Sequence, residues 1–439
     1  MTPGRAAPKL LASLMLMRIF GCLLATLALA CPAQAARFVV LLDPPPEMGK
    51  RLDPAALRAH MDAQVAALER RLPRAPMRVV HQLWIASALA VDASPEMARR
   101  LAADPGVREV RVDELQQEPV SETPSTTATP STTATTTTTP GWNVDAIGAR
   151  RVWRELGSTG QGVTVGIIDS GVDPTHPALA GRIAAWRDFT ATASPTPTFT
   201  TGHGTHVAGI IAGSGVGGVA PGARLVIARV FGPEGAFDSS FLAAMQWMLD
   251  PDGDPATDDA PRVVSNSWGT SSPDNRTFWQ AVQVWRAAGI FPSFSIGNYG
   301  PRPGTAGTPG AYPHAFAAGA CGPDGAVNRQ SSRGPAVWDG VDVMKPDLAA
   351  PGLRVFSAWP GGGLRAVSGT SMACPHVSAT VALMRALDPK LTVEETERIL
   401  RGTARDVGDA GPDAESGAGT LDAYAACRAV LARRAGAAR

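Results

Sequence analysis

Three short segments carry side chains that could together cleave a covalent bond. Asp169 ends the apolar run in VGIIDSG, His203 stands between glycines in TGHGTHVAGIIAG, and Ser371 precedes the apolar run in SGTSMACPHVSATVALM. A serine hydroxyl is a weak nucleophile, so it needs a base to take its proton and an acid to orient that base. Histidine and aspartate supply these groups, and the set indicates nucleophilic catalysis.

Each of these residues also has an ordinary structural explanation. Asp-Ser-Gly suits a turn, a histidine beside glycine suits a loop, and a hydroxyl before an apolar helix is a common N-cap. Taken singly, the turn at Asp169 and the cap at Ser371 are the stronger interpretations. The combination favours catalysis, because the unpaired N–H groups of a helix start can donate to an oxyanion as well as to a capping side chain.

The elements that must position these residues follow an alternating pattern from residue 141 onward. GVTVGIIDSGV, RLVIARVF, RVVSNSWG and GIFPSFSIGN predict strands, and SSFLAAMQWML and DNRTFWQAVQVWRAAG predict helices between them. This alternation predicts an α/β fold with a mostly parallel sheet covered on both faces. Thr392 and Glu395 predict a capping box for a later helix. Ligands gather at the carboxyl ends of parallel strands, and Asp169 lies at one such end.

The first 35 residues are typical of an export signal peptide. Three basic residues precede the apolar run 19–30, and an A-x-A cleavage pattern follows at 33–35. The run is short for a membrane span. An uncleaved anchor and a lipid anchor on Cys31 remain as alternatives.

Two further segments separate this leader from the α/β unit. Residues 37–118 predict the order β-α-β-β-α-β, which indicates a small ferredoxin-like α+β domain. Residues 119–140 contain SETPSTTATPSTTATTTTTP, which has no aromatic residue and no aliphatic residue larger than alanine. Such a segment cannot bury a core and predicts an extended linker. The α/β unit then covers residues 141–433.

Composition excludes some classes of function. The formal net charge of +1 argues against binding nucleic acid by bulk electrostatics. Cys321, Cys374 and Cys427 lie beyond the leader, and no cysteine spacing resembles a zinc site. The fold is therefore not expected to depend on a disulfide framework.

The three segments resemble the active-site motifs of the subtilisin-like serine proteases. IIDSGVDPTHPAL, GHGTHVAGIIAG and SGTSMACPHVSA occur in that family's order, and NSWG, GNYG, SSRGP and KPDLAAPG extend the resemblance over about residues 142–430. The acidic insertion before NSWG resembles the bacillopeptidase F-like branch. The resemblance implies a subtilisin-like three-layer sandwich. Residues 37–118 resemble, more loosely, the inhibitory propeptide of these proteases.

The resemblance also implies roles for individual residues. Ser371 would attack the scissile carbonyl, His203 would take its proton and pass it to the leaving amine, and Asp169 would orient His203. Asn298 and the backbone N–H of Ser371 would bind the oxyanion. The implied protein is a secreted serine endopeptidase, made as a preproenzyme that processes itself and requiring no cofactor for its chemistry. A pseudoprotease that only binds peptides, and a lipid-anchored scaffold, are the alternatives.

Substrate would bind as an added strand, which favours broad specificity. The residues implied to bind it are Ser267, Trp268 and Gly269 on one side, Gly235 and Ala236 on the other, and Ala311 at the base of the P1 pocket. The expected partners are polypeptide substrates and the chain's own propeptide, with no nucleic acid, and the expected state is a monomer without a transmembrane helix after processing.

An acidic loop, DPDGDPATDDAP at 250–261, carries five aspartates. Carboxylate-rich loops bind calcium, but this loop lacks the glutamate that closes an EF-hand at its twelfth position. A structural calcium bound by Asp252, Asp254 and Asp258, and a solvated acidic loop without metal, are both left open.

Overall fold

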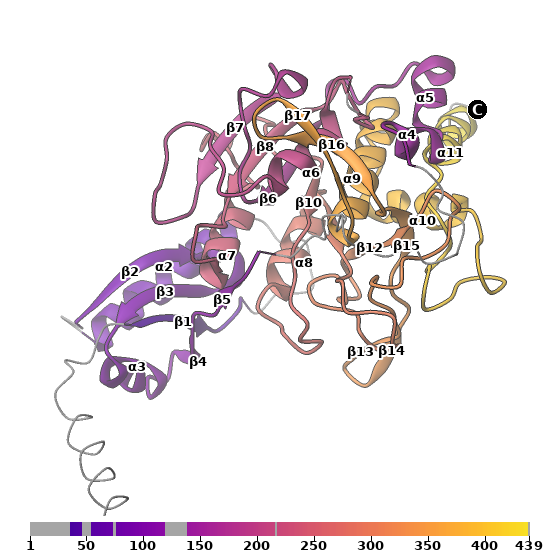
Figure 1. Cartoon of the computed structure of the whole chain (residues 1–439). Coiled ribbons are helices and arrows are strands. Elements are labelled where there is room, and N and C mark those ends of the chain that lie inside the picture. Colours follow the sequence, from indigo (N-terminus) through magenta and orange to yellow (C-terminus); the bar gives the residue numbers. More distant parts are fainter. Residues whose placement is uncertain (1–35, 46–53, 73–75, 119–137, 216, 438–439) are drawn as a thin grey trace, which may run out of the picture.

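The structure is a computed structural model in which two units pack together (Figure 1). The residues described are 36–45, 54–72, 76–118, 138–215 and 217–437. The expected signal peptide at 1–35 lies outside them, as does the linker segment 119–137. Among the described residues, no helix combines the length and apolarity needed to cross a membrane.

The N-terminal unit is a four-stranded antiparallel sheet with two helices. Its sheet order is β2-β3-β1-β4, with β1 between β3 and β4. The elements are β1 (Ala36–Leu42), α2 (Pro54–Arg71), β2 (Met77–Leu83), η1 (Trp84–Ala86), β3 (Ala88–Ala93), α3 (Pro95–Ala102) and β4 (Val107–Val112). Ser94 is the N-cap of helix α3, because its hydroxyl accepts a hydrogen bond from the Met97 N–H at 3.1 Å. The order β-α-β-β-α-β expected from the sequence is observed.

The second unit is built on a seven-stranded sheet in which every neighbouring pair is parallel. In sheet order its strands are β15 (Leu348–Pro351), β12 (Phe316–Cys321), β11 (Phe291–Ser295), β10 (Val263–Asn266), β6 (Thr164–Asp169), β8 (Arg224–Arg229) and β7 (Ile183–Asp188). The predicted parallel sheet is therefore confirmed.

Helices cover both faces of this sheet, and the strand residues alternate between them. Val165 and Ile167 of β6 belong to the apolar cluster of α6 (His203–Ala212), α9 (Thr370–Leu387) and α11 (Ala423–Ala437), whereas Ile168 belongs to the cluster of α7 (Asp238–Trp247) and α8 (Trp279–Ala287). Successive side chains of a strand point to opposite faces, so β6 feeds two cores. The three-layer α/β sandwich expected from the sequence is confirmed.

The remaining elements are short or peripheral. They are β5 (Leu115–Gln116), α4 (Trp142–Ala146), α5 (Ala149–Arg151), η2 (Val152–Leu156), η3 (Pro177–Leu179), β9 (Ala236–Phe237), β13 (Ala336–Trp338), β14 (Val341–Val343), β16 (Val355–Trp359), β17 (Gly363–Val367) and α10 (Val393–Thr403). Helix α10 has the predicted capping box, with both bonds between Thr392 and Glu395 formed. Cys321, Cys374 and Cys427 are free and buried.

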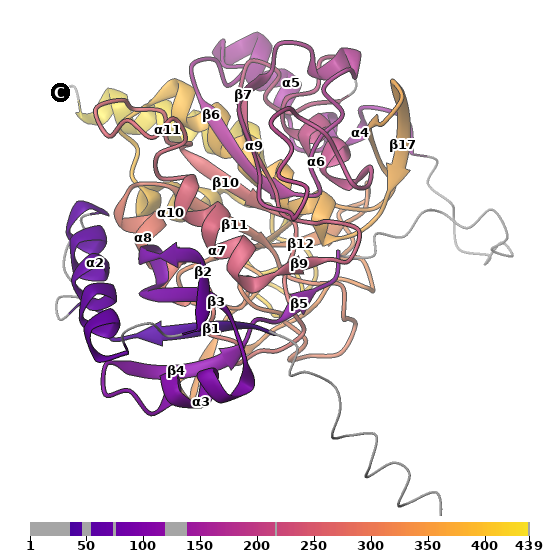
Figure 2. The same ribbon diagram turned by 90° about the vertical axis from the view of Figure 1, so that its left-hand side faces the viewer.

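The N-terminal unit rests on α7 and α8 in both views (Figures 1 and 2), and its core is continuous with the cluster of those helices. Polar contacts add to this interface at the start of α7. The Asp113 carboxylate accepts hydrogen bonds from the Ser239 N–H at 3.0 Å and the Ser239 hydroxyl at 2.5 Å. The Glu114 carbonyl accepts one from the Asp238 N–H at 3.0 Å. The N-terminal unit thus caps a helix of the second unit.

Replacing Asp113 with alanine should therefore destabilise the two-unit molecule. The variant leaves a buried helix N–H and a hydroxyl without their acceptor, which costs about 1–2 kcal/mol. Urea unfolding in a Ser371→Ala background, with the free energy of unfolding as readout, measures this loss. The matched control is Glu114→Gln, whose side chain is exposed. Equal stability of the two variants would contradict the capping role.

Candidate active site

The candidate residues meet at the carboxyl edge of the sheet. Asp169 is the last residue of β6, Ser267 follows β10, and Asn298 lies shortly after β11; these three strands are neighbours in the sheet. His203 opens α6 and Ser371 is the second residue of α9. The fold therefore brings together side chains from five separate stretches of chain.

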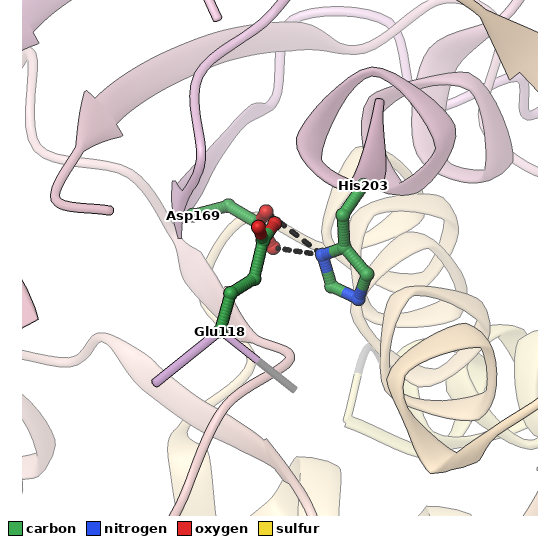
Figure 3. A group of neighbouring side chains, drawn as sticks. All are labelled: Glu118, Asp169 and His203. Atoms are coloured by element: carbon green, nitrogen blue, oxygen red, sulfur yellow. Dashed lines mark hydrogen bonds and ion pairs between the residues drawn. The ribbon is translucent and has the colours of Figure 1, made fainter. Parts of the chain in front are cut away.

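Asp169 and His203 form a buried pair (Figure 3). The His203 Nδ1 lies 2.8 and 3.0 Å from the two carboxylate oxygens of Asp169, and the side chains are 7% and 1% exposed. The backbone N–H of Ser170 donates to Asp169 Oδ1 at 2.7 Å and holds the carboxylate in place. Because Nδ1 donates to the carboxylate, Nε2 of the neutral ring is left to accept a proton.

The surroundings of His203 favour its protonated form overall. Burial opposes a charge on the ring, but the charge and hydrogen bond of Asp169, with the charge of Glu118, outweigh it and raise the pKa of His203. An imidazole whose cation is stabilised in this way is suited to hold a proton briefly between two transfers.

Two glycines allow α6 to approach the strand that carries Asp169. A Cβ on Gly204 would lie 2.1 Å from the carbonyl oxygen of Gly171, and Gly171 itself has φ +92°. A Cβ on Gly202 would lie 2.4 Å from the ring of Trp359. The glycines around His203 thus permit close packing of the helix start against its neighbours.

Ser371 is bonded to the end of β10 by a reciprocal pair of hydrogen bonds. Its hydroxyl donates to the Ser267 carbonyl at 3.2 Å, and the Ser267 hydroxyl donates to the Ser371 carbonyl at 2.8 Å. The Ser371 carbonyl is available because Pro375, one helical turn later, has no N–H to donate. The N-cap of α9 is Gly369, with φ +147° and no side-chain cap, so Ser371 is not the capping residue that its segment suggested.

In this state the Ser371 hydroxyl donates its hydrogen bond to Ser267 and not to His203. Among the residues that the structure describes, His203 Nε2 has no hydrogen-bond partner. Transfer of the proton to His203 requires the Ser371 hydroxyl to turn away from the Ser267 carbonyl.

Asn298 is oriented by the hydrogen bonds that its amide oxygen accepts. Its Oδ1 accepts hydrogen bonds from both the N–H and the hydroxyl of Thr370 at 2.9 Å, which directs the Nδ2 donor elsewhere. Asn298 and Ser371 line one cavity of about 330 Å³. The arrangement suits a donor that waits for a developing negative charge.

The implied substrate residues divide between this cavity and its supports. Gly269 lines the cavity, whereas Trp268 is buried against aromatic neighbours. Ala311 is also buried and belongs to the apolar cluster of Ile296, while Gly307 is the residue that lines the cavity from that loop. The role of Ala311 at the base of the P1 pocket stays a prediction, and the residue lies buried behind this part of the cavity wall.

Gly235 and Ala236 lie where an added strand is already present. Ala236 pairs with Gln116 and Phe237 with Leu115, so β9 and β5 form a two-stranded antiparallel sheet. A Cβ on Gly235 would lie 2.5 Å from the Gln116 carbonyl oxygen. The glycine thus permits close approach of another backbone at this edge.

Glu118 completes the site, although the sequence assigned it only to the end of the N-terminal unit. Its carboxylate accepts a hydrogen bond from the Thr201 hydroxyl at 2.5 Å. It lies beside the carboxylate of Asp169 and the ring of His203 (Figure 3). Burial, and then the charge of Asp169, raise the pKa of Glu118. No motif marks this residue; the available clue was its place as the last residue before the linker.

The acidic loop gathers only part of the set predicted for calcium. The carboxylate oxygens of Asp250, Asp252 and Asp259 lie close together, whereas Asp254 and Asp258 are outside this group. Most of these carboxylates already serve other partners: Asp252 Oδ1 accepts from the Asp254 N–H, and Asp258 pairs with Arg262. The loop's own hydrogen bonds account for its conformation.

Comparison with known proteins agrees with this geometry. The model of the Subtilase family matches residues 160–419. Bacillopeptidase F of Bacillus subtilis (strain 168) is 35% identical over 382 residues, covering 80% of this chain but 26% of that protein, so this chain spans about a quarter of its length. An alkaline protease of Alkalihalobacillus alcalophilus is 29% identical over 357 residues (80% and 82%), and Subtilisin Savinase of Lederbergia lenta is 32% identical over 292 residues (65% and 98%).

The chain belongs to the subtilase family, as its motifs indicated. It is a serine endopeptidase, a hydrolase.

The contact between Glu118 and the buried pair can be tested directly. Replacing Glu118 with glutamine removes a negative charge that raises the pKa of His203. NMR titration of His203 in a Ser371→Ala molecule should therefore show a lower pKa in the variant. Glu109→Gln, an exposed glutamate of the same unit, is the control. An unchanged or higher His203 pKa in Glu118→Gln would contradict the contact.

Proposed function

We propose that this chain is a secreted endopeptidase made as a self-processed preproenzyme. The observation that carries the proposal is that residues 115–116 pair with β9 as an added strand, and the chain runs on to Glu118 beside His203. Gln117 and Glu118 line the same cavity as Asn298 and Ser371. These contacts support the proposal that residues 115–118 lie in the substrate channel, the path between β9 and Ser267–Gly269.

The segment combines main-chain pairing with side-chain contacts. Beyond the two pairs with β9, the Gln117 side chain donates to the Glu234 carbonyl at 3.2 Å. A strand added to a sheet edge gains affinity from its backbone, whatever its side chains. Residues 37–118 would accordingly act as an intramolecular inhibitor, and substrates of varied sequence would bind between β9 and Ser267–Gly269 after its removal.

The chemistry follows from the roles assigned to the site. Ser371 Oγ attacks the scissile carbonyl while His203 Nε2 takes its proton, and the oxyanion is held by Asn298 Nδ2 and the Ser371 N–H. His203 then protonates the leaving amine, and an acyl-enzyme remains. Water, deprotonated by His203, hydrolyses the ester and restores Ser371. Asp169 keeps the ring in its tautomer throughout.

The leader and linker extend the proposal to processing and location. The signal-like residues 1–35 support export, and the linker at 119–140 supports a cut between the two units. A pseudoprotease that only binds peptides would not need the buried Asp169–His203 pair. A lipid anchor on Cys31 would leave an acylated N-terminus, which mass spectrometry distinguishes from a start at Ala36 or beyond.

Self-processing predicts that Ser371→Ala accumulates with residues 37–118 attached, whereas wild type loses them. N-terminal sequencing and intact mass of the two exported proteins measure this, and casein hydrolysis reports activity. Ser271→Ala, an exposed serine, is the control that should process normally. A wild-type protein that stays full length and hydrolyses no protein substrate would overturn the proposal in favour of peptide binding.

The oxyanion role predicts a selective loss in Asn298→Leu. Removing the Nδ2 donor should lower kcat by about 10²–10³-fold with a small change in KM, because the bond forms in the transition state. Steady-state kinetics on a peptide anilide measure both constants. Asn298→Asp keeps the acceptor for Thr370 but lacks the donor, so it should lose kcat as well. Retention of kcat in both variants would contradict the assignment.

A further inference from the structure

Asp238 is a buried carboxylate that the proposed chemistry does not use. It is the first residue of α7 and is 1% exposed. Its Oδ1 accepts a hydrogen bond from the side-chain amide of Gln116 at 3.2 Å, and the Thr277 hydroxyl approaches its Oδ2 at 3.5 Å. Gln116 belongs to β5, the strand in the substrate channel. The Gln116 side chain of β5 therefore contacts a carboxylate, that of Asp238, in the wall of the proposed substrate channel.

The cover over Asp238 comes largely from the N-terminal unit. Besides the Gln116 contact, the Glu114 carbonyl accepts a hydrogen bond from the Asp238 N–H. The Asp113 carboxylate accepts one from the N–H of the next residue, Ser239. Burial raises the pKa of Asp238 to about 7. Departure of residues up to 118 would remove these contacts from Asp238.

The charges around Asp238 are also supplied by the N-terminal unit. Arg111 lowers the pKa of Asp238 through its charge, while Asp113 and Glu114 raise it. Arg111 donates to the Thr277 hydroxyl at 2.6 Å, so its cation lies at the same position of the wall. Among the described residues, Asp238 forms no ion pair, so Arg111 acts on it only through its charge. Removal of the N-terminal unit thus removes the amide donor and the cation together.

We propose that Asp238 selects substrates that carry lysine or arginine at the position occupied here by Gln116. This inference rests on the proposed function, in which β5 marks the path of a substrate. A cationic side chain there would replace both the Gln116 hydrogen bond and the Arg111 charge. A hydrogen bond to an ionised group is stronger than one between neutral groups, so the cation is preferred over glutamine or leucine.

The alternative is that Asp238 only stabilises the start of α7, where an acidic side chain is favourable. That role predicts no dependence of cleavage on substrate side chains. The two roles therefore differ in specificity, which can be measured without knowing where the scissile bond lies relative to β5.

The test is cleavage-site profiling of a proteome-derived peptide library by the processed enzyme, read by mass spectrometry. Wild type should enrich lysine and arginine at one fixed position N-terminal to the cleaved bond. Synthetic peptides that differ only there should show kcat/KM about ten-fold higher for arginine than for leucine. In Asp238→Asn this ratio should fall to about one, and Asp238→Glu should restore part of it. Asp274→Asn, which removes an exposed aspartate, should keep the wild-type ratio.

Three outcomes would overturn the inference. Wild type without basic enrichment does so by itself, even if Asp238→Asn fails to fold or process. A preference retained in Asp238→Asn, or lost equally in Asp274→Asn, does so as well. If wild type cleaves no peptide at all, the proposed endopeptidase function fails together with this inference, whereas cleavage without basic preference overturns only the role of Asp238.

Discussion

The parallel pairing of β6 with β10, and of β10 with β11, is the constraint on which the site depends. Parallel strands end at the same edge, so Asp169, Ser267 and Asn298 arrive side by side although about 130 residues separate the first from the last. The helices α6 and α9 then begin at that edge because they follow from it or pack across it. The sheet thus brings the candidate catalytic side chains together, while the loops mainly connect its strands to the helices.

Much of this arrangement could be predicted from the sequence. Apolar runs ending in Asp169 and the alternation of strands with helices defined the sheet, and the capping box of Thr392 and Glu395 defined a helix start. These signals are local, since each depends on residues a few positions apart. The hydroxyl contact between Ser371 and Ser267 could not be predicted in this way, because it joins residues 104 apart through a tertiary arrangement. The depth of Ala311 behind the cavity could not be predicted for a related reason, since it depends on how a long loop packs.

Glu118 and Asp238 show a second limit of sequence reasoning. Each is ordinary in its own segment, one before a linker and the other at a helix start. Their environments come from the contact between two units that fold from separate stretches of chain. Burial at that contact raises the pKa of both carboxyl groups. A sequence pattern within either unit carries no information about such a contact. The contact becomes evident from the pairing of β5 with β9, which joins the two units.

Pro375 has an effect that reaches beyond its own turn of α9. By leaving the Ser371 carbonyl without a helical donor, it lets Ser267 bind there, and the two backbones hold each other from both sides. The start of α9 and the end of β10 are thereby linked so that they should move as one rigid body. Thermal displacement of either should carry the other along, so Ser371, the proposed nucleophile, would stay at a constant distance from a peptide bound along Ser267–Gly269.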